Sequence, residues 1–460
     1  MSKDDKIPTG RLRRSSQVGR LAATQAAKQV GTRAANVVRS DEAGRAALDR
    51  RQLETAEQIV AALGTMKGAA MKLGQMLSFM DVGLVPEEFR EDFQAKLAEL
   101  RDAAPKVSFK EMRKVIEGEY GEKLDEVFET FDPVPVAAAS IGQVYKARLH
   151  DGRDVAVKVQ YPGIGAAVRA DMQNLGLILR LMKGVAPGLD PKALGEEIRE
   201  RIDEELDYEL EASNQRTLAR IYDGHPFIIV PKVMTDLSHE KVIVSEFVSG
   251  RGFEECKQLP DEERNRIGEI IFRFYFGSMY RHHQFSGDPH PGNSMLLDDG
   301  RMAFIDFGLF KRLPKEVADF ELTTQRLGIE RRGDELIEHL TEGGWITGRN
   351  AYEPEEILYQ FDEFVGWYTK NEPIELTPEY ATRVMLEMSD PRSSFFGKMR
   401  HETLPPDHLF GRRLETLTLA VLGQLRATAN WGAIAREWID GSPPVTELGR
   451  EEAEFYAGVS

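Results

Sequence analysis

The stretch Asp288-Pro-His-Pro-Gly-Asn293 and the later tripeptide Asp306-Phe-Gly308 give the strongest indication of the fold. An asparagine follows the first aspartate by five residues, and the tripeptide ends a hairpin-like pattern with an Asp-Gly turn at its centre. Carboxylate and amide oxygens suit Mg²⁺, above all when phosphate oxygens complete its coordination shell. This layout predicts that Asn293 and Asp306 bind Mg²⁺ and that Asp288 is the catalytic base of a phosphoryl-transfer site.

A second hairpin is predicted upstream, where the sequence pattern changes to short runs of residues with high β propensity. Protein kinases have G-x-G-x-x-G-x-V in the first part of such a hairpin and V-A-I-K at its end. Here Gly142 and Val144 match the first pattern, and the hairpin ends in VAVK with Lys158. Ala137 and Ala139 replace the first two glycines. Each added Cβ penalises a positive φ, so we expect nucleotide binding that differs from that of ordinary kinases. The alternative is a valine-rich strand with a surface lysine.

The acidic run from Glu205 to Ala212 is expected to lie within one long helix, whose default interpretation is a solvated acidic face. On a single helix Glu205 and Glu211 are about 120° apart, so one lysine cannot easily engage both. We therefore assign Glu211 to the ion pair with Lys158 that kinases form between the lysine strand and a helix. This leaves Glu205 and Asp207 for another role.

An earlier helical pattern carries Lys72 and Gln75, which are three residues apart and share one helix face. A surface pair is the default interpretation, because spacing alone indicates nothing more. The histidines at 282, 283 and 290 are expected to be structural or exposed to solvent, since no carboxylate–histidine helical pair accompanies them.

Together these motifs resemble the UbiB family of atypical, protein-kinase-like proteins, also called aarF-domain-containing kinases. The resemblance covers about residues 53 to 313 and rests on K-x-G-Q, the alanine-rich loop, E-x-D, D-P-H-P-G-N and D-F-G. It implies an α+β, two-lobed protein-kinase-like fold with a helical N-terminal extension and a helix-rich C-lobe. In that family the K-x-G-Q helix occupies the cleft of a peptide substrate. Lys72 and Gln75 are therefore expected to contact Glu205 and Asp207, with a regulatory or cleft-occluding role.

We expect four parts in the chain: a basic flexible arm (1–45), the K-x-G-Q extension (46–130), an N-lobe with a helical insert and the E-x-D helix (131–250), and a C-lobe with the catalytic and metal loops (251–460). ATP and Mg²⁺ are the implied cofactors. The catalytic candidates are Asp288, Lys158 and Glu211, and the metal candidates are Asn293 and Asp306. The nucleotide-binding candidates are Ala137, Ala138, Ala139, Ser140, Gly142, Val144, Lys158, Glu246 and Val248.

The composition excludes several classes of protein. The 460 residues are 41% hydrophobic and 30% charged, which excludes a disordered or fibrous chain. The net charge of −16 argues against nucleic acid as a main partner, because a duplex demands a basic surface. One cysteine, Cys256, excludes a disulfide framework. No window approaches about 20 consecutive apolar residues, so any membrane contact is expected to be peripheral.

The first 40 residues differ from the rest, with nine lysines and arginines against two aspartates. A solvated tail is the default interpretation, and attraction to an anionic lipid surface is the sharper one. The Arg-rich composition also weakly resembles an organelle transit peptide. We expect a cytoplasmic protein, with peripheral attachment to the inner face of a membrane and organelle targeting as alternatives.

The family resemblance implies support of isoprenoid-quinone (coenzyme Q) biosynthesis through ATP binding and hydrolysis. No A-P-E follows D-F-G, and FGLFKRLPKEVADF is expected to begin a helix instead, which argues against a conventional protein kinase. The leading hypothesis is an Mg-ATP-dependent ATPase or lipid kinase. The second is an ATP-gated lipid-binding scaffold or chaperone, and a protein kinase is third. The expected partners are a nucleotide, an anionic lipid surface or isoprenoid lipid, and further protein chains in a homo- or hetero-oligomer.

Overall fold

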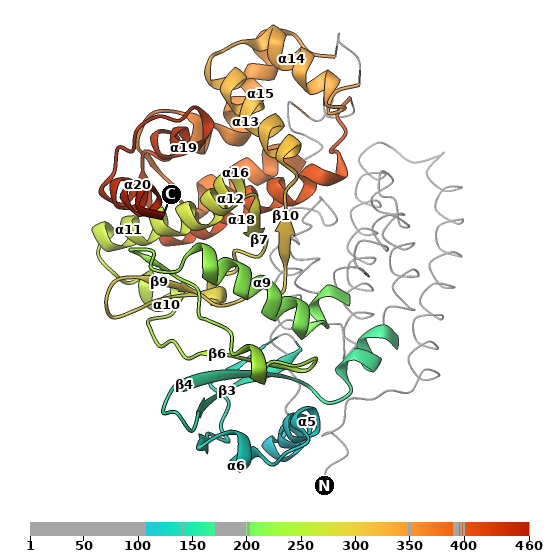
Figure 1. The fold of residues 1–460 in the computed structure, drawn as a ribbon. Coiled ribbons are helices and arrows are strands. Elements are labelled where there is room, and N and C mark those ends of the chain that lie inside the picture. The colour runs from blue at the N-terminus through green and yellow to red at the C-terminus, as the bar shows by residue number, and fades with distance from the viewer. Residues whose placement is uncertain are drawn as a thin grey trace, which may run out of the picture. The chain divides into compact units, whose positions relative to one another are not determined.

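A computed structural model describes residues 107–139, 141–170, 203–347, 351–389 and 401–459, with Arg199, Phe395 and Lys398 as isolated positions. The chain divides into two compact units (Figure 1). The first unit comprises the described residues up to Glu209 together with Met234–Ser245. The second comprises Leu210–Val233 and the residues from Glu246 onward. Two units with mixed sheet and helix agree with the expected α+β, two-lobed architecture.

A five-stranded sheet organises the first unit. Its strands are β1 (Thr130–Phe131), β2 (Ala137–Ala138), β3 (Gly142–Arg148), β4 (Asp154–Gln160) and β6 (Val242–Glu246). They pair in the order β1-β3-β4-β6, with β2 also on β3. β3 and β4 pair along their whole length, and Gly152 takes φ +87° in the turn between them. The predicted hairpin is confirmed.

Alternation of side chains sets the buried face of this sheet. Val155, Val157 and Val159 of β4 are fully buried, as the period-2 pattern of a strand requires. Helices α5 (Phe109–Tyr120) and α6 (Leu124–Val127) accompany the sheet in this unit. Phe109 of α5 packs against Phe131 and Tyr145, with ring centroids 5.6 Å apart in both pairs. The aromatic rings therefore join α5 to the sheet.

The long acidic helix expected through residue 212 is interrupted, so that prediction is wrong. Residues 203–205 are helical, Leu206 lies in a turn, and α9 (Tyr208–Ile221) begins only after Asp207. The side chain of Gln160 donates to the carbonyl of Leu206 over 2.8 Å, which takes that acceptor out of the helix. Asp207 is also a residue type that favours the position just before a helix. The 120° relation between Glu205 and Glu211 consequently does not hold.

Small sheets in the second unit carry the chemistry-bearing loops. The strands are β5 (Ile228–Ile229), β7 (Gln284–Ser286), β8 (Ser294–Leu296), β9 (Met302–Phe304), β10 (Phe310–Arg312), β11 (Ile374–Glu375) and β12 (Thr428–Ala429). β8 and β9 form an antiparallel hairpin with β5 parallel to β9, and β7 pairs antiparallel with β10. The predicted hairpin before Asp306 is confirmed.

Helices make up most of the second unit (Figure 1). After α9 come α10 (Phe253–Cys256), α11 (Asp261–Phe272), α12 (Ser278–His282), α13 (Lys315–Ile329), α14 (Gly333–Glu342), α15 (Pro354–Thr369), α16 (Pro378–Ser389), α18 (Leu409–Leu425), α19 (Trp431–Ile439) and α20 (Glu447–Val459). A π-helical segment (Arg273–Gly277) joins α11 to α12, and Phe272, Phe274 and Phe276 at this junction are fully buried. α13 begins soon after Gly308, as the sequence predicts.

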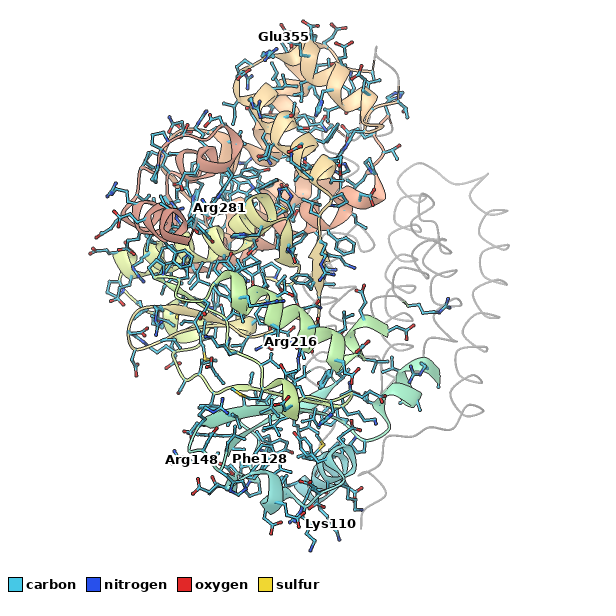
Figure 2. The ribbon with its side chains drawn as sticks, in the orientation of Figure 1. Lys110, Phe128, Arg148, Arg216, Arg281 and Glu355 are labelled. Atoms are coloured by element: carbon cyan, nitrogen blue, oxygen red, sulfur yellow. The ribbon has the colours of Figure 1, made fainter. Side chains whose placement is uncertain are left out.

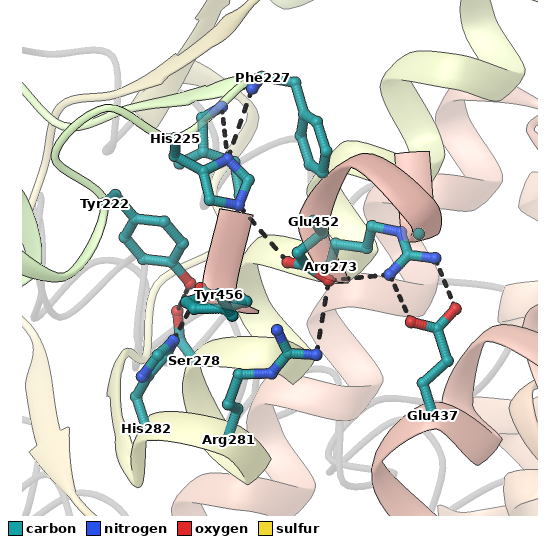
Figure 3. Close-up of polar contacts among 12 residues, drawn as sticks. Tyr222, His225, Phe227, Arg273, Ser278, Arg281, His282, Glu437, Glu452 and Tyr456 are labelled. Atoms are coloured by element: carbon teal, nitrogen blue, oxygen red, sulfur yellow. Dashed lines mark hydrogen bonds and ion pairs between the residues drawn. The ribbon is translucent and has the colours of Figure 1, made fainter. Parts of the chain in front are cut away.

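A buried ionic network connects the C-terminal helices to this core (Figure 3). Arg273, whose side chain is fully buried, donates to Glu437 of α19 over 2.7 and 2.9 Å and to Glu452 of α20 over 2.9 Å. It also donates to Glu269 of α11 over 2.7 Å. Arg281, labelled in Figure 2, stacks on Tyr456 of α20 at 4.3 Å. Removing one partner of such a network leaves buried charge uncompensated, which costs about 3–5 kcal/mol.

Candidate nucleotide and metal site

The loop between β7 and β8 carries two of the candidate residues. It contains Asp288 and a short 3₁₀ turn, Pro291–Asn293. The ring Nδ1 of His290 accepts from the backbone N–H of Gly292 over 3.0 Å and so pins the turn. The Nδ2 of Asn293 donates to the carbonyl of Asp288 over 3.1 Å. Because its Nδ2 is used inside the loop, Asn293 presents its Oδ1 as the atom that could bind a metal.

Asp288 carries a buried carboxylate oxygen that a bound ligand could satisfy. Its Oδ1 is buried and has no hydrogen-bond partner among the described residues of the chain. A buried acceptor without a partner costs about 1–3 kcal/mol. The carbonyl of the same residue is held by Asn293 and, over 3.4 Å, by the hydroxyl of Tyr275. A fixed backbone with an unsatisfied carboxylate oxygen fits a group that accepts a proton from, or orients, a bound hydroxyl.

Asp306 follows the end of β9, on a segment bonded to the first loop. The backbone N–H of Ile305 donates to the carbonyl of Asn293 over 3.0 Å. The hydroxyl of Ser286 donates to the carbonyl of Asp306 over 3.4 Å, and the N–H of Gly308 donates to its Oδ1 over 3.1 Å. Asn293 and Asp306, far apart in the sequence, therefore lie on directly connected segments.

The donor set fits Mg²⁺ in the presence of phosphate. Within the described ranges, no cluster of three or more His, Cys, Asp or Glu side chains is arranged to hold a metal. A site made of one amide and one carboxylate is typical of Mg²⁺, which keeps several waters and shares phosphate oxygens with its substrate. Asn293 and Asp306 would be the protein ligands of such an ion.

Helix α9 brings Glu211 to the Asp-Phe-Gly segment. Glu211 is 2% exposed. A Cβ placed on Gly308 would lie 3.6 Å from Glu211 Oε2 and 3.5 Å from Asp306 Oδ1, so both carboxylates flank this glycine. Asn214, one turn later on α9, donates from Nδ2 to the carbonyl of Phe307 over 3.3 Å. Sequence reasoning missed Asn214, although its spacing of three from Glu211 places it on the same helix face.

Lys158 lies on β4 in the first unit, opposite Val144 of β3. Its Nζ lies 5.3 Å from the ring centroid of Tyr208, which is within the range of a cation–π contact. Tyr208 is fully buried, and the sequence analysis did not identify it. The expected ion pair between Lys158 and Glu211 joins residues of different units and stays a prediction.

The alanine-rich segment forms a hairpin with β3. Ala137 pairs with Val144 and Ala138 with Gln143, and the N–H of Ala139 donates to the carbonyl of Gly142 over 2.9 Å. Among the described non-glycine residues, a positive φ occurs only at 283, 331 and 426, so these alanines carry no such strain. Alanine is tolerated because this hairpin needs no left-handed residue.

Gly142 has a packing role. A Cβ at this position would lie 2.2 Å from the carbonyl oxygen of Val159 and 3.0 Å from the hydroxyl oxygen of Tyr208. Close approach of β3 and β4 therefore requires glycine here, whatever the loop does with phosphates. Ser140, also a nucleotide-binding candidate, lies outside the described residues.

The remaining candidate residues lie in different parts of the fold, and two of them lie outside the described residues. Glu246, at the end of β6, accepts from the backbone N–H of Lys232 over 2.9 Å, so its carboxylate has a structural partner. Val248 follows β6 and is half-buried. Glu205 and Asp207 lie on either side of the helix break described above. The residues expected opposite them, Lys72 and Gln75, lie outside the described residues, so the cleft-occluding contact stays a prediction.

Comparison with known proteins agrees with this architecture. Residues 99–324 match the ABC1 atypical kinase-like domain. The chain is 29% identical to the atypical kinase COQ8B, mitochondrial, of Rattus norvegicus, over 64% of this chain and 55% of that protein. It is 28% identical to the atypical kinase coq-8, mitochondrial, of Caenorhabditis elegans, over 83% of this chain and 50% of that protein. It thus spans about half the length of these curated relatives.

A solved structure covers more of the chain. The erythromycin complex of Rv3197 from Mycobacterium tuberculosis is 34% identical, with a TM-score of 0.63, over 87% of this chain and 99% of that one. Fold and motifs together define an atypical, kinase-like protein with an α+β architecture. The chain belongs to the ABC1 atypical kinase-like family, in agreement with the UbiB resemblance of its motifs.

Proposed function

We propose that this protein binds Mg-ATP and acts as an ATPase or small-molecule kinase that supports isoprenoid-quinone or related lipid metabolism at a membrane surface. The observation that carries the proposal is the pair of bonded loops holding Asp288, Asn293 and Asp306, with an unsatisfied buried oxygen on Asp288. Mitochondrial atypical kinases among the relatives support the kinase-like chemistry. The lipid setting rests on the UbiB resemblance.

Each residue has one task in this proposal. Bound Mg²⁺ would neutralise charge on the phosphates, and Asn293 and Asp306 would hold it. Lys158 would place a positive charge beside the α- and β-phosphates. Asp288 would orient water or an acceptor hydroxyl and take its proton. Asn214 positions the Asp-Phe-Gly backbone through its bond to Phe307.

Turnover of Mg-ATP by purified full-length protein, with and without anionic liposomes, tests this proposal. We expect Asp306→Asn to abolish turnover and Asp288→Asn to lower kcat about 100-fold or more, because general base catalysis contributes about 10²–10⁴. Asp298→Asn, an exposed aspartate in the β8–β9 hairpin, is the matched control and should turn over like wild type. EDTA should abolish all activity. Wild-type turnover in Asp306→Asn would overturn the proposal.

One observation favours a second function, an ATP-gated scaffold or lipid chaperone with little catalysis. Ala137 and Ala138 are exposed and paired with β3, and Ala137 and Ala139 stand where an ordinary kinase has glycines. In that case Lys158→Ala would abolish cellular function whereas Asp288→Asn would not. A conventional protein kinase is disfavoured, because β10 and then α13 follow Gly308 where an activation segment would lie.

A further inference from the structure

The π-helical segment Arg273–Gly277, between α11 and α12, connects the C-terminal helices to the loop that carries Asp288. Arg273 contacts α19 and α20, and Tyr275 contacts the loop. Side chains two positions apart point to nearly opposite sides of a helix, so the segment lies between these two parts of the second unit. Turns of π-helix are rare and occur frequently at functional sites. The segment is therefore a candidate for positioning the loop.

Arg273 holds the segment in one orientation relative to the C-terminal helices (Figure 3). Its Nε donates to Glu269 over 2.7 Å, and its terminal nitrogens donate to both oxygens of Glu437 over 2.7 and 2.9 Å. They also donate to Glu452 over 2.9 Å and to the hydroxyl of Thr446, just before α20, over 3.0 Å. A guanidinium has five N–H donors, and these contacts use all five. Because the side chain is fully buried, bulk water does not replace a partner that is lost.

Glu452 is the residue through which α20 takes part in this network. Its carboxylate lies 2.9 Å from Arg273, 3.8 Å from Arg281 and 3.6 Å from His225. Burial raises the pKa of Glu452, but the neighbouring His225 and the positive charges of Arg273 and Arg281 outweigh burial and hold the pKa below its ordinary value. Glu452 is therefore ionised at neutral pH, and α20 supplies a negative charge to two arginines.

Tyr275 reaches the loop from the other side of the segment. It is 3% exposed, and within the described part of the chain its hydroxyl donates to the carbonyl of Asp288, 3.4 Å away. Burial, reinforced by the negative charges of Asp288 and Asp306, raises the pKa of Tyr275 well above its ordinary value. The hydroxyl therefore stays protonated and acts as a donor, and it is near enough to both candidate carboxylates to be affected by their charge.

Two donors hold the carbonyl of Asp288, and they differ in kind. Asn293 belongs to the same loop, so its bond fixes the internal shape of the loop. Tyr275 belongs to a buried helical segment, so its bond determines where the loop lies relative to the core. The ring of Tyr275 also packs edge-on against Phe304, with the centroids 5.8 Å apart, and Phe304 precedes Asp306 by two residues. Tyr275 thus contacts both segments that carry the candidate site.

We propose that Tyr275 is a positioning residue for Asp288 and that helix α20 holds Tyr275 in place through Arg273. The hydroxyl fixes the backbone of Asp288, and the backbone determines where its unsatisfied Oδ1 points. The C-terminal helix thereby affects the geometry of the candidate catalytic base from a distance. The proposal rests on the proposed function in one respect, the role of Asp288 as the base, whereas the packing that it describes does not depend on ATP chemistry.

Hydrogen exchange of the full-length protein tests the packing without requiring any turnover. Tyr275→Phe removes only the hydroxyl, and we expect amide exchange in residues 287–293 to become about twofold to fivefold faster, because one long hydrogen bond is lost. Exchange in α14 should not change. Tyr280→Phe is the matched control, because its buried hydroxyl donates to Glu415 and not to the loop. Wild-type exchange of residues 287–293 in Tyr275→Phe, or equal acceleration in both variants, would refute the proposal.

Steady-state turnover of Mg-ATP tests the effect on Asp288. Tyr275→Phe should lower kcat about twofold to fivefold and leave the KM for Mg-ATP unchanged, because the hydroxyl acts on the base and not on the nucleotide. In an Asp288→Asn background the same substitution should have no further effect. A loss of kcat of the same size in both backgrounds would contradict the positioning role. A wild type without turnover would overturn the proposed function and leave the exchange test intact.

Variants of the C-terminal region test the second half of the proposal. Glu452→Gln keeps the shape of the side chain but removes the charge that faces Arg273, and it should accelerate exchange in residues 287–293 as Tyr275→Phe does. Glu454→Gln, exposed on the same helix, is the control and should exchange as wild type. Thr446→Val removes one acceptor of Arg273 and is milder, so it replaces Glu452→Gln if that variant does not fold. Unchanged exchange in residues 287–293, with or without faster exchange in α20, would show that the C-terminal helix does not act on the loop.

Discussion

His282, at the end of α12, shows how burial changes the chemistry of a single side chain. Its Nε2 lies 2.9 Å from the hydroxyl oxygen of Tyr456, and its ring packs against Tyr222 (Figure 3). Burial, reinforced by the nearby positive charge of Arg281, lowers the pKa of His282 to about 4. The neutral imidazole is therefore the stable form in the folded protein. This is a structural role, one of the two that the sequence predicts for this histidine, the other being exposure to solvent.

Acid should destabilise the protein through His282. The unfolded chain takes up this proton near pH 6.5, whereas the folded protein does so only near pH 4, so the contribution is complete above pH 6.5 and is lost as the pH falls toward 4. The limit is about 3 kcal/mol in the free energy of unfolding. Urea titrations at pH 7, 6, 5 and 4 measure it. His282→Gln should show a shallower pH dependence than wild type, whereas His150→Gln, an exposed histidine, should follow the wild-type slope. Parallel slopes for all three would contradict this prediction.

The β3–β4 hairpin and helix α9 show which elements local sequence signals predict and which they do not. The sequence predicted the β3–β4 hairpin well, because alternation and an Asp-Gly turn are local signals. It did not predict the break before α9, since the bond from Gln160 to Leu206 joins residues 46 positions apart. Asn214 was missed for the same reason: its partner, the carbonyl of Phe307, is 93 positions away.

Gly142→Ala should destabilise the first unit. The new Cβ would lie 2.2 Å from the carbonyl oxygen of Val159, and strand backbone cannot move aside without breaking the β3–β4 pairing. Overpacking of this kind costs about 1–3 kcal/mol or more. Gly118→Ala, in α5 with nothing within 4 Å of its Cβ, is the matched control and should be neutral or slightly stabilising. Urea unfolding measures both, and equal midpoints would show that the hairpin relaxes without cost.

At the scale of the whole molecule, charge is distributed unevenly along the chain. The net charge is −16, yet the first 40 residues carry nine basic residues and two aspartates. Within the described residues, no helix is both long and apolar enough to cross a membrane. The charge of this basic segment suits an anionic lipid surface, and this role stays a prediction.

Deletion of residues 1–40 should weaken co-sedimentation with anionic liposomes at low salt. Each basic residue near such a surface contributes about 1 kcal/mol, and the attraction fades within the Debye length. Replacing Arg11, Arg13 and Arg14 with glutamine should lower the bound fraction in part, and 0.5 M salt, about threefold above physiological ionic strength, should remove it. Neutral liposomes are the control. Equal binding by the deleted and full-length proteins at low salt would show that the segment is only a solvated tail.

The sequence by itself determined the family and the two hairpins, and it selected Asp288, Asn293 and Asp306 as candidates, because each of these depends on short-range spacing and turn chemistry. Only the tertiary structure decided that Glu211 and Asp306 flank Gly308 and that Gly142 is required for strand packing. It also joined Arg273 to helices α19 and α20. Contacts between distant residues depend on how helices and strands pack, and no local pattern encodes which partners that packing brings together.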